Sequence, residues 1–227
     1  MPSYILSGVV MFKTSRILAP FALVLFAAPL FGQVTFTGGA VIIVDNAQAA
    51  PSFINVSGYT GSITKVTVTL NGFTHTFTDD VAALVTGPNQ NTQNTLLFDG
   101  PGLDGGAGTS VTNLTLTFDD AAVPAVTLPQ NANFGSGTYL PGLNQYNDAF
   151  TAPAPAAPYN TNFSSFNGAS PDGDYTLYLR DYVSGDSGSI SSWSIIIFGI
   201  TPVPEPTTVL AGVAGLAFVG RMMRRKS

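Results

Sequence analysis

The chain has a single histidine, His75, and this residue limits the acid–base chemistry that the sequence offers. A serine protease triad needs a histidine as the general base for its serine nucleophile. Alternation along a strand places His75 on the same face as Phe73 and Phe77, which is typical of a packed, hydrogen-bonded histidine. The sequence contains no Gly-x-Ser-x-Gly segment. We therefore predict no catalytic residues and a protein that is not an enzyme.

Aspartates are the other candidate functional residues, and several stand in pairs or close together around expected turns. Ca²⁺ binds oxygen ligands, and carboxylates on loops beside backbone carbonyls can supply them. Solvated aspartates are also common in turns, where they accept local backbone hydrogen bonds, so this second explanation stays open. The chain has no cysteine, which excludes disulfides and thiolate metal sites. The candidate calcium ligands are Asp79, Asp80, Asp99, Asp104, Asp119, Asp120, Asp181 and Asp186.

Tyrosines in expected loops are candidates for a flat aromatic surface that binds sugar rings. Tyrosine combines a large apolar ring with a hydroxyl group, so it can stack on a ligand and also form a hydrogen bond. Scattered surface tyrosines without such a role are the alternative explanation. The four residues are Tyr139, Tyr146, Tyr159 and Tyr182.

The charge of the central region excludes several classes of partner. Residues 33–202 contain only two basic residues, Lys65 and Arg180, against twelve aspartates, which gives a net charge of −10. Such a domain repels the phosphates of nucleic acids and anionic lipids. The region is also long enough to bury a hydrophobic core without disulfides or an obligatory cofactor.

The elements that must position these residues are predicted to be β-strands. Residues 64–70, 113–118 and 175–179 alternate apolar and polar side chains, as half-buried antiparallel strands do. Residues 194–198 are continuously apolar, which predicts a strand covered on both faces. Clusters of Gly, Asn, Asp and Pro between these segments, including Asn71 and Gly72, predict turns.

This pattern predicts an all-β fold, a jelly-roll-like antiparallel β-sandwich over residues 33–200. No stretch of this region has a convincing helical period. The Pro- and Ala-rich residues 151–158 resemble a linker between domains. Too few strands follow them for a second sandwich, so we expect a long, semi-rigid surface loop.

Three segments follow one another at the C-terminus, in residues 201–227. Prolines keep residues 203–206 extended, residues 207–220 are apolar and uncharged, and residues 221–227 are basic and expected to stay cytoplasmic. The apolar segment is 14 residues long, whereas a spanning helix needs roughly 20. The residues concerned are Val203, Pro204, Glu205 and Pro206 in the motif, and Arg221, Arg224, Arg225 and Lys226 in the basic tail.

This order resembles the PEP-CTERM sorting signal of exopolysaccharide-producing Gram-negative bacteria. The resemblance implies a short transmembrane helix that holds the exported protein in the inner membrane until an exosortase, a transpeptidase-like enzyme, cuts near the motif. A permanent membrane anchor is the alternative.

The N-terminus predicts export. Lys13 and Arg16 precede an apolar stretch, residues 17–31, that ends in small residues, which is the pattern of a secretory signal peptide over residues 1–32. An uncleaved anchor is the alternative. A start at Met11 would give a more compact basic region, and this choice also stays open.

The central region resembles the P domain (P/Homo B) that follows the catalytic domain of proprotein convertases of the kexin and furin type. The resemblance runs from about Asn55 to Gly199, and it departs from the family at two positions. Tyr175 stands where the family usually has Trp, and Ala82 stands where many bacterial members carry Asp, which weakens any cation site built from that loop. The matching segments are residues 63–68, 72–81, 84–88, 95–98, 116–122, 166–168, 171–181 and 186–195.

Three functions follow from these observations. We favour an exported, non-enzymatic cell-surface or extracellular-matrix protein whose sandwich binds exopolysaccharide or another envelope component. The P-domain resemblance implies instead an accessory domain for an exported subtilisin-like serine endopeptidase. The tyrosines suggest a carbohydrate-binding module.

Overall fold

The computed structural model describes residues 32–103 and 108–203. Residues 1–31 of the predicted signal peptide, Pro204 to Pro206 of the sorting motif, the apolar segment, the basic tail and Asp104 lie outside the described residues. Among the described residues, no helix is long and apolar enough to cross a membrane.

The first of two sheets is built around one long strand, β4 (Tyr59–His75). β11 (Ser192–Pro202) pairs with β4 along one edge and β7 (Val111–Phe118) along the other, both antiparallel. The remaining strands of this sheet are β1 (Gly32–Gly38) beside β11, β10 (Gly188–Ile190) beside β4, β2 (Val41–Ile43) beside β10, and β8 (Gly137–Tyr139), which runs parallel to β7.

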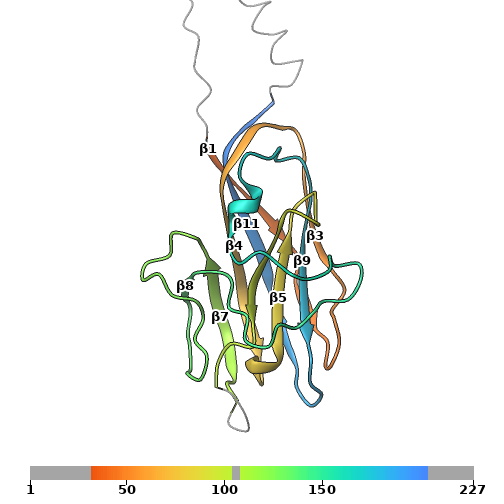
Figure 1. The fold of residues 1–227 in the computed structure, drawn as a ribbon, viewed down its shortest axis with the longest axis vertical. Coiled ribbons are helices and arrows are strands. Elements are labelled where there is room, and N and C mark those ends of the chain that lie inside the picture. The colour runs from red at the N-terminus through yellow and green to blue at the C-terminus, as the bar shows by residue number, and fades with distance from the viewer. Residues whose placement is uncertain (1–31, 104–107, 204–227) are drawn as a thin grey trace, which may run out of the picture.

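The second sheet packs against the first. It has the strand order β3 (Ser52–Val56), β9 (Gly173–Asp181), β5 (Val81–Thr86) and β6 (Asn94–Asp99), and every pair is antiparallel. The only helical turns among the described residues are two short 3-10 turns, η1 (Thr78–Asp80) and η3 (Phe163–Phe166). The predicted all-β, jelly-roll-like sandwich is confirmed (Figure 1).

The predicted turn at Asn71 and Gly72 is wrong, because both residues lie within β4. Gly72 has φ of +69°, and the pairing of β4 with β7 shifts register between Leu70 and Phe73. A residue with positive φ inside a strand produces a bulge, for which glycine is the least costly residue. The Asn-Gly pair therefore does bend the chain, but the bend is a bulge within β4 and not a turn that ends the strand.

The prediction that residues 194–198 are covered on both faces is also wrong. Ile195 and Ile197 are buried between the sheets, whereas Ile196 and Phe198 are only half-buried on the outer face. Nothing in the second sheet covers this outer face, and the ammonium group of Lys65 lies 5.4 Å from the centre of the Phe198 ring. At this position the Lys65 ammonium group covers the Phe198 ring through a cation–π contact, where the prediction expected a second layer of apolar side chains.

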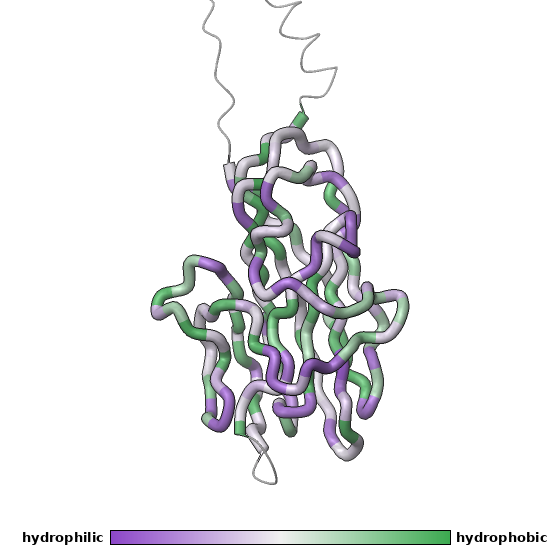
Figure 2. The backbone as a smooth tube through the Cα atoms, in the orientation of Figure 1, coloured by the Kyte–Doolittle hydropathy of each residue, from purple (hydrophilic) through white to green (hydrophobic). Residues whose placement is uncertain are grey.

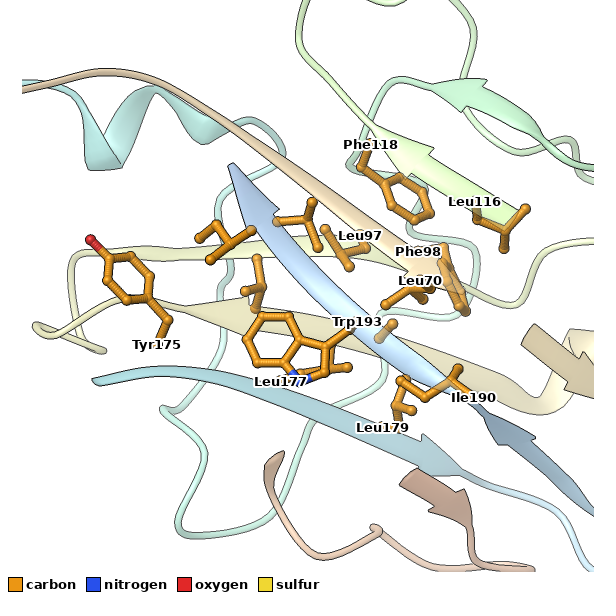
Figure 3. Close-up of a cluster of buried hydrophobic side chains, with 14 of the residues drawn as sticks. Leu70, Leu97, Phe98, Leu116, Phe118, Tyr175, Leu177, Leu179, Ile190 and Trp193 are labelled. Carbon is orange, nitrogen blue, oxygen red and sulfur yellow. The ribbon is translucent and has the colours of Figure 1, made fainter. Parts of the chain in front are cut away.

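The core lies between the two sheets and centres on large aromatic side chains (Figure 3). Trp193 of β11 is fully buried, and its Nε1 donates a hydrogen bond to Ser52 Oγ at 2.9 Å. Tyr175 of β9 is equally buried, stacks on Phe166, and donates its hydroxyl hydrogen to the carbonyl of Pro171. The position where the P-domain family usually has Trp therefore holds a buried aromatic ring.

The two ends of the sandwich differ. β1 begins and β11 ends at the same end, where both chain termini leave the described body (Figure 1). The loops that join β2 to β3, β4 to β5, and β9 to β10 lie at the opposite end, which we call the loop end (Figure 1). Residues 140–172 carry no strand and include many hydrophilic residues (Figure 2). Phe150 and Tyr159 of this segment pack on the outer face of the second sheet, whereas Phe163 and Phe166 of η3 enter the core between the sheets. The expected surface loop at residues 151–158 belongs to this segment.

Candidate functional site: an acidic pocket with two tyrosines

The loop end gathers acidic side chains from several loops. Asp79 and Asp80 lie in η1, between β4 and β5, and Asp181 closes β9. Asp186 follows in the β9–β10 loop, where Thr76 donates a hydrogen bond to it at 2.9 Å. Asp45 lies beside the same loop and accepts a hydrogen bond from the backbone N–H of Gly185. Neither Lys65 nor Arg180 forms an ion pair with any of these carboxylates.

A pocket of about 400 Å³ opens among these loops. Its lining residues are Asp79, Asp80, Tyr146, Asp148, Tyr182 and Val183.

Asp79 of η1 is hydrogen-bonded to two residues of the long loop, Tyr146 and Gln145. Its side chain is 5% exposed, and its Oδ2 accepts a hydrogen bond from the hydroxyl of Tyr146 at 2.7 Å. Its Oδ1 accepts a longer hydrogen bond from Gln145 Nε2 at 3.3 Å. A buried carboxylate requires such donors, because an unsatisfied one would be costly. The ring of Tyr146 is thereby held at the pocket rim while remaining 44% exposed.

Asp99, at the end of β6, holds the loop that supplies Tyr146 and Asp148. Its Oδ2 accepts hydrogen bonds from the backbone N–H groups of Tyr146 at 3.3 Å and Asp148 at 3.2 Å. Burial raises the pKa of the Asp99 carboxyl, and these N–H donors oppose that rise because they favour the charged form. Asp99 is therefore a structural support of the pocket wall.

Burial and mutual repulsion perturb the carboxylates that line the pocket. The pKa of Asp80 is raised from 3.8 to about 6, first by burial and then by the negative charges of Asp181, Asp186 and Asp79. Burial likewise raises the pKa of Asp148, against the opposing effect of Arg180. Carboxyl groups with raised pKa values in a hollow are typical of binding or reaction sites, although structural clusters also show them.

Tyr182 lines the pocket, and Arg180 lies against its ring. The guanidinium carbon of Arg180 lies 4.4 Å from the centre of the Tyr182 ring, and Nη1 donates a hydrogen bond to the carbonyl of Ala149 at 2.7 Å. The residues that line the pocket include three aspartates, Asp79, Asp80 and Asp148, and no basic residue, so carboxylates outnumber the one neighbouring cation.

His75 lies beneath the loop end with Asp181. Both side chains have 0% exposure, and Nε2 of His75 lies 3.3 Å from Oδ2 of Asp181, although the two atoms are not aligned as a hydrogen bond. Nδ1 of His75 lies 3.1 Å from the backbone nitrogen and 2.9 Å from the carbonyl oxygen of Phe77. His75 is therefore packed and hydrogen-bonded, as its strand position predicted.

The structure divides the candidate calcium ligands into two groups. Asp79, Asp80, Asp99, Asp181 and Asp186 share the loop end. Asp119 forms an ion pair with Lys65 at 2.7 Å, and Asp120 accepts a hydrogen bond from the backbone N–H of Phe163. Lys65 and His75 are ten residues apart on β4, roughly 30 Å along a strand. Within residues 32–103 and 108–203, no three His, Asp or Glu side chains form a group able to hold a metal ion.

The four candidate tyrosines do not form one platform. Tyr146 and Tyr182 line the acidic pocket. Tyr159 instead packs edge-on against Phe150, and Tyr139 donates its hydroxyl hydrogen to the carbonyl of Gly135 in the β7–β8 loop.

Sequence analysis missed Asp148, Gln145 and the role of Arg180. Each of these contacts forms because the long loop reaches the end of β6, and no local sequence motif predicts that approach.

Ala82, which stands where many P domains have Asp, is fully buried in a second apolar cluster with Phe150 and Tyr178. Its antiparallel cross-strand partners are Arg180 of β9 and Asp99 of β6.

Comparison with known proteins identifies no family: no protein-family model matches the chain, and no curated protein matches it. Among solved structures, it is similar to the serine protease of Aeromonas sobria, with 13% identity and a TM-score of 0.33. The same protease in complex with its chaperone gives 14% identity and a TM-score of 0.35. In both comparisons the match covers 76% of this chain but only 28% of the protease chain.

Proposed function

We propose that this chain is an exported, non-enzymatic cell-surface or extracellular-matrix protein whose sandwich binds a component of the cell envelope. The observation that supports the proposal is that the ends of the described chain and the acidic pocket lie at opposite ends of the sandwich. The first described residues of β1 and the last of β11 lie at one end of the sandwich (Figure 1), and the residues that line the acidic pocket belong to the opposite, loop end. A protein held by its terminal segments would present this pocket away from the membrane.

The chemistry of the pocket favours a partner that carries basic groups. Carboxylates of Asp80 and Asp148 beside two tyrosine rings attract a lysine, arginine or amine, and the rings add cation–π stabilisation. The net charge of −10 over residues 33–202 extends this preference to long range. An envelope protein with a basic surface fits these properties.

The two terminal segments are the basis of the proposed export and sorting. A signal peptide would export the chain, and the PEP-CTERM-like tail would hold it in the inner membrane until an exosortase cuts near Pro204 to Pro206. The test is the intact mass of the native protein in its own host, measured separately in culture fluid, cell surface and inner membrane. A released form ending near Pro206 supports sorting. A form that retains Arg224 to Ser227 and occurs only in the inner membrane contradicts it.

Calcium remains a proposal that rests on ligand type. The loop end supplies carboxylates, and Ca²⁺ bound to the folded state alone would raise its stability. Melting curves with millimolar CaCl₂ and with EGTA test it. A melting temperature that EGTA lowers in the wild type but not in Asp80→Asn supports a site at the loop end. Identical wild-type melting curves in CaCl₂ and in EGTA would contradict the calcium proposal.

The P-domain resemblance supports a second proposal, an accessory domain for an exported subtilisin-like endopeptidase. The observation that supports it is the two-sheet sandwich itself, in which Trp193, at the end of the resembling segments, is a fully buried core residue. Affinity purification from the native host distinguishes the two functions. An active serine endopeptidase recovered in stoichiometric amount supports the accessory role, and its absence from a preparation that retains other envelope proteins contradicts it.

A further inference from the structure

A second, chemically different groove lies on the outer side of the second sheet. It has a volume of about 490 Å³ and is lined by residues 88–91 on one side and residues 153–156 on the other. The first wall follows β5, whereas Asp80 precedes it, so the two sites are separated by the length of this six-residue strand, about 20 Å. None of the lining residues is ionisable.

The wall at residues 88–91 is rigid because the loop is braced by its own hydrogen bonds. The backbone N–H of Gly87 donates to the carbonyl of Gln93 at 2.8 Å, and that of Gln93 donates to the carbonyl of Asn89 at 2.7 Å. The Asn89 N–H donates to Gln93 Oε1 at 2.8 Å, and Asn94 Nδ2 donates to the carbonyl of Gln90 at 2.9 Å. A loop satisfied in this way loses little further entropy when a ligand binds.

The opposite wall is fixed on an apolar cluster. Phe150 packs against the rings of Tyr159 and Tyr178, with Ala154 of the groove wall beside them. The hydroxyl of Tyr159 accepts a hydrogen bond from the Phe150 N–H at 3.0 Å and lies 3.3 Å from the carbonyl of Pro155. The proline-rich loop therefore has a defined position on the sheet.

One hydroxyl connects the two walls. Tyr178 Oη lies 2.8 Å from Gln90 Oε1 on one side and 3.3 Å from the carbonyl oxygen of Pro153 on the other. The ring of Tyr178 is buried in the apolar cluster, so its hydroxyl is a fixed point. The spacing of the walls is thus set by the fold before any ligand binds.

The side-chain amides of two residues on the first wall, Asn89 and Asn91, face solvent. Asn89 and Asn91 are exposed, and within the described part of the chain neither side-chain amide forms a hydrogen bond. Each amide offers two donors and an acceptor, which matches the paired donor and acceptor character of sugar hydroxyls. The groove has no ionisable residue that could pair with a charged side chain of a peptide.

We propose that this groove binds a segment of a neutral polysaccharide through amide–hydroxyl hydrogen bonds. The negative charge of the domain disfavours anionic polysaccharides, because their carboxylates would be repelled over several ångströms. The inference rests on the proposed function in one respect: it names the ligand class through which an exported matrix protein would bind exopolysaccharide.

Affinity electrophoresis of the full chain tests the proposal. The gels contain a neutral detergent without a sugar head group and one of three neutral polysaccharides (dextran, galactomannan or a β-1,3-glucan), with alginate as the anionic comparison. We expect retardation by at least one neutral polysaccharide and none by alginate. The double variant Asn89→Ala/Asn91→Ala should bind about tenfold more weakly, because it loses the hydrogen bonds of both amides.

A matched control is Asn133→Ala, which removes an exposed amide from the β7–β8 loop on the other side of the sandwich. This variant should bind like the wild type, and fluorescence of the single tryptophan, Trp193, reports whether each variant is folded. Migration unaffected by all three neutral polysaccharides would overturn the proposal, as would equal retardation of folded wild type and double variant. Either result leaves the sorting proposal intact, because intact masses test that proposal independently.

Discussion

Nε2 of His75 lies 3.3 Å from Oδ2 of Asp181, and neither side chain is exposed to solvent. His75 ends β4 in the first sheet and Asp181 ends β9 in the second, so the pair joins the two sheets beneath the loop end. On its other side, Nδ1 of His75 lies 3.1 Å from the backbone nitrogen of Phe77 and 2.9 Å from its carbonyl oxygen. The single histidine is thus a polar connection inside the core.

We expect His75→Phe to lower the free energy of unfolding by about 2–4 kcal/mol, because it leaves Asp181 buried without its polar neighbour and removes the acceptor of the Phe77 N–H. Urea unfolding followed by circular dichroism measures this change. Asp186→Asn, which affects a half-buried carboxylate in the same loop region, is the control and should shift stability by less than about 1 kcal/mol. Equal effects of the two variants would contradict the structural role of His75.

Two adjacent glycines give a matched pair of substitutions. A methyl group at Gly38 would overlap the indole of Trp193, whereas a methyl group at Gly39 would meet no atom within 4 Å. We expect Gly38→Ala to destabilise the fold by about 1–3 kcal/mol, because the close-packed core must move to accommodate it. Gly39→Ala should be nearly neutral. Thermal melts of both variants measure the difference, and two equal melting temperatures would refute this packing.

Stability should decrease as pH rises from about 4 to about 6. The pKa of Asp80 is about 6 in the folded protein against an ordinary value of 3.8, so the folded state binds this proton more tightly than the unfolded chain does. Its contribution is fully present below pH 4 and is lost as pH rises through 6. Asp80→Asn should flatten the dependence of the unfolding free energy on pH, measured by urea titrations at pH 4, 5, 6 and 7. An unchanged slope would exclude Asp80 as its source.

Arg180 should control the order of the loop that forms one wall of the acidic pocket. Arg180→Gln removes the hydrogen bond to the Ala149 carbonyl and the cation over the Tyr182 ring. We expect faster amide hydrogen exchange in residues 145–151 with little change in the core strands, because local opening becomes easier while global stability is largely retained. Exchange measured by mass spectrometry tests this expectation. Unchanged exchange in residues 145–151 would show that Arg180 does not control the order of this loop.

Strand positions could be predicted where alternation was regular. Val66, Val68 and Leu70 are buried on one face of β4, as the period of two requires. The bulge at Gly72 was missed because an Asn-Gly pair has the same composition in a turn and inside a bent strand. The half-buried state of Phe198 was missed because an apolar run does not reveal which face a neighbouring layer will cover.

The candidate site was predicted only in part, for a similar reason. Acidic pairs and loop tyrosines were recognised by residue type, but Asp119 and Asp80 cannot be told apart by sequence, since both stand in an Asp-Asp pair beside a turn. The structure distinguishes them because Lys65 neutralises Asp119, whereas Asp80 lies among other carboxylates.

The sequence by itself determined the all-β class and the acidic charge, because these depend on residue type and local order. The absence of catalytic residues and the terminal sorting segments stay predictions of the same kind. Only the tertiary structure decided which aspartates and tyrosines meet, that His75 joins the two sheets, and that an uncharged amide groove lies one strand length from an acidic pocket. These features depend on contacts between residues far apart in the sequence, such as Asp45 with Gly185, which are 140 positions apart. Chain folding creates such contacts, and no local pattern encodes them.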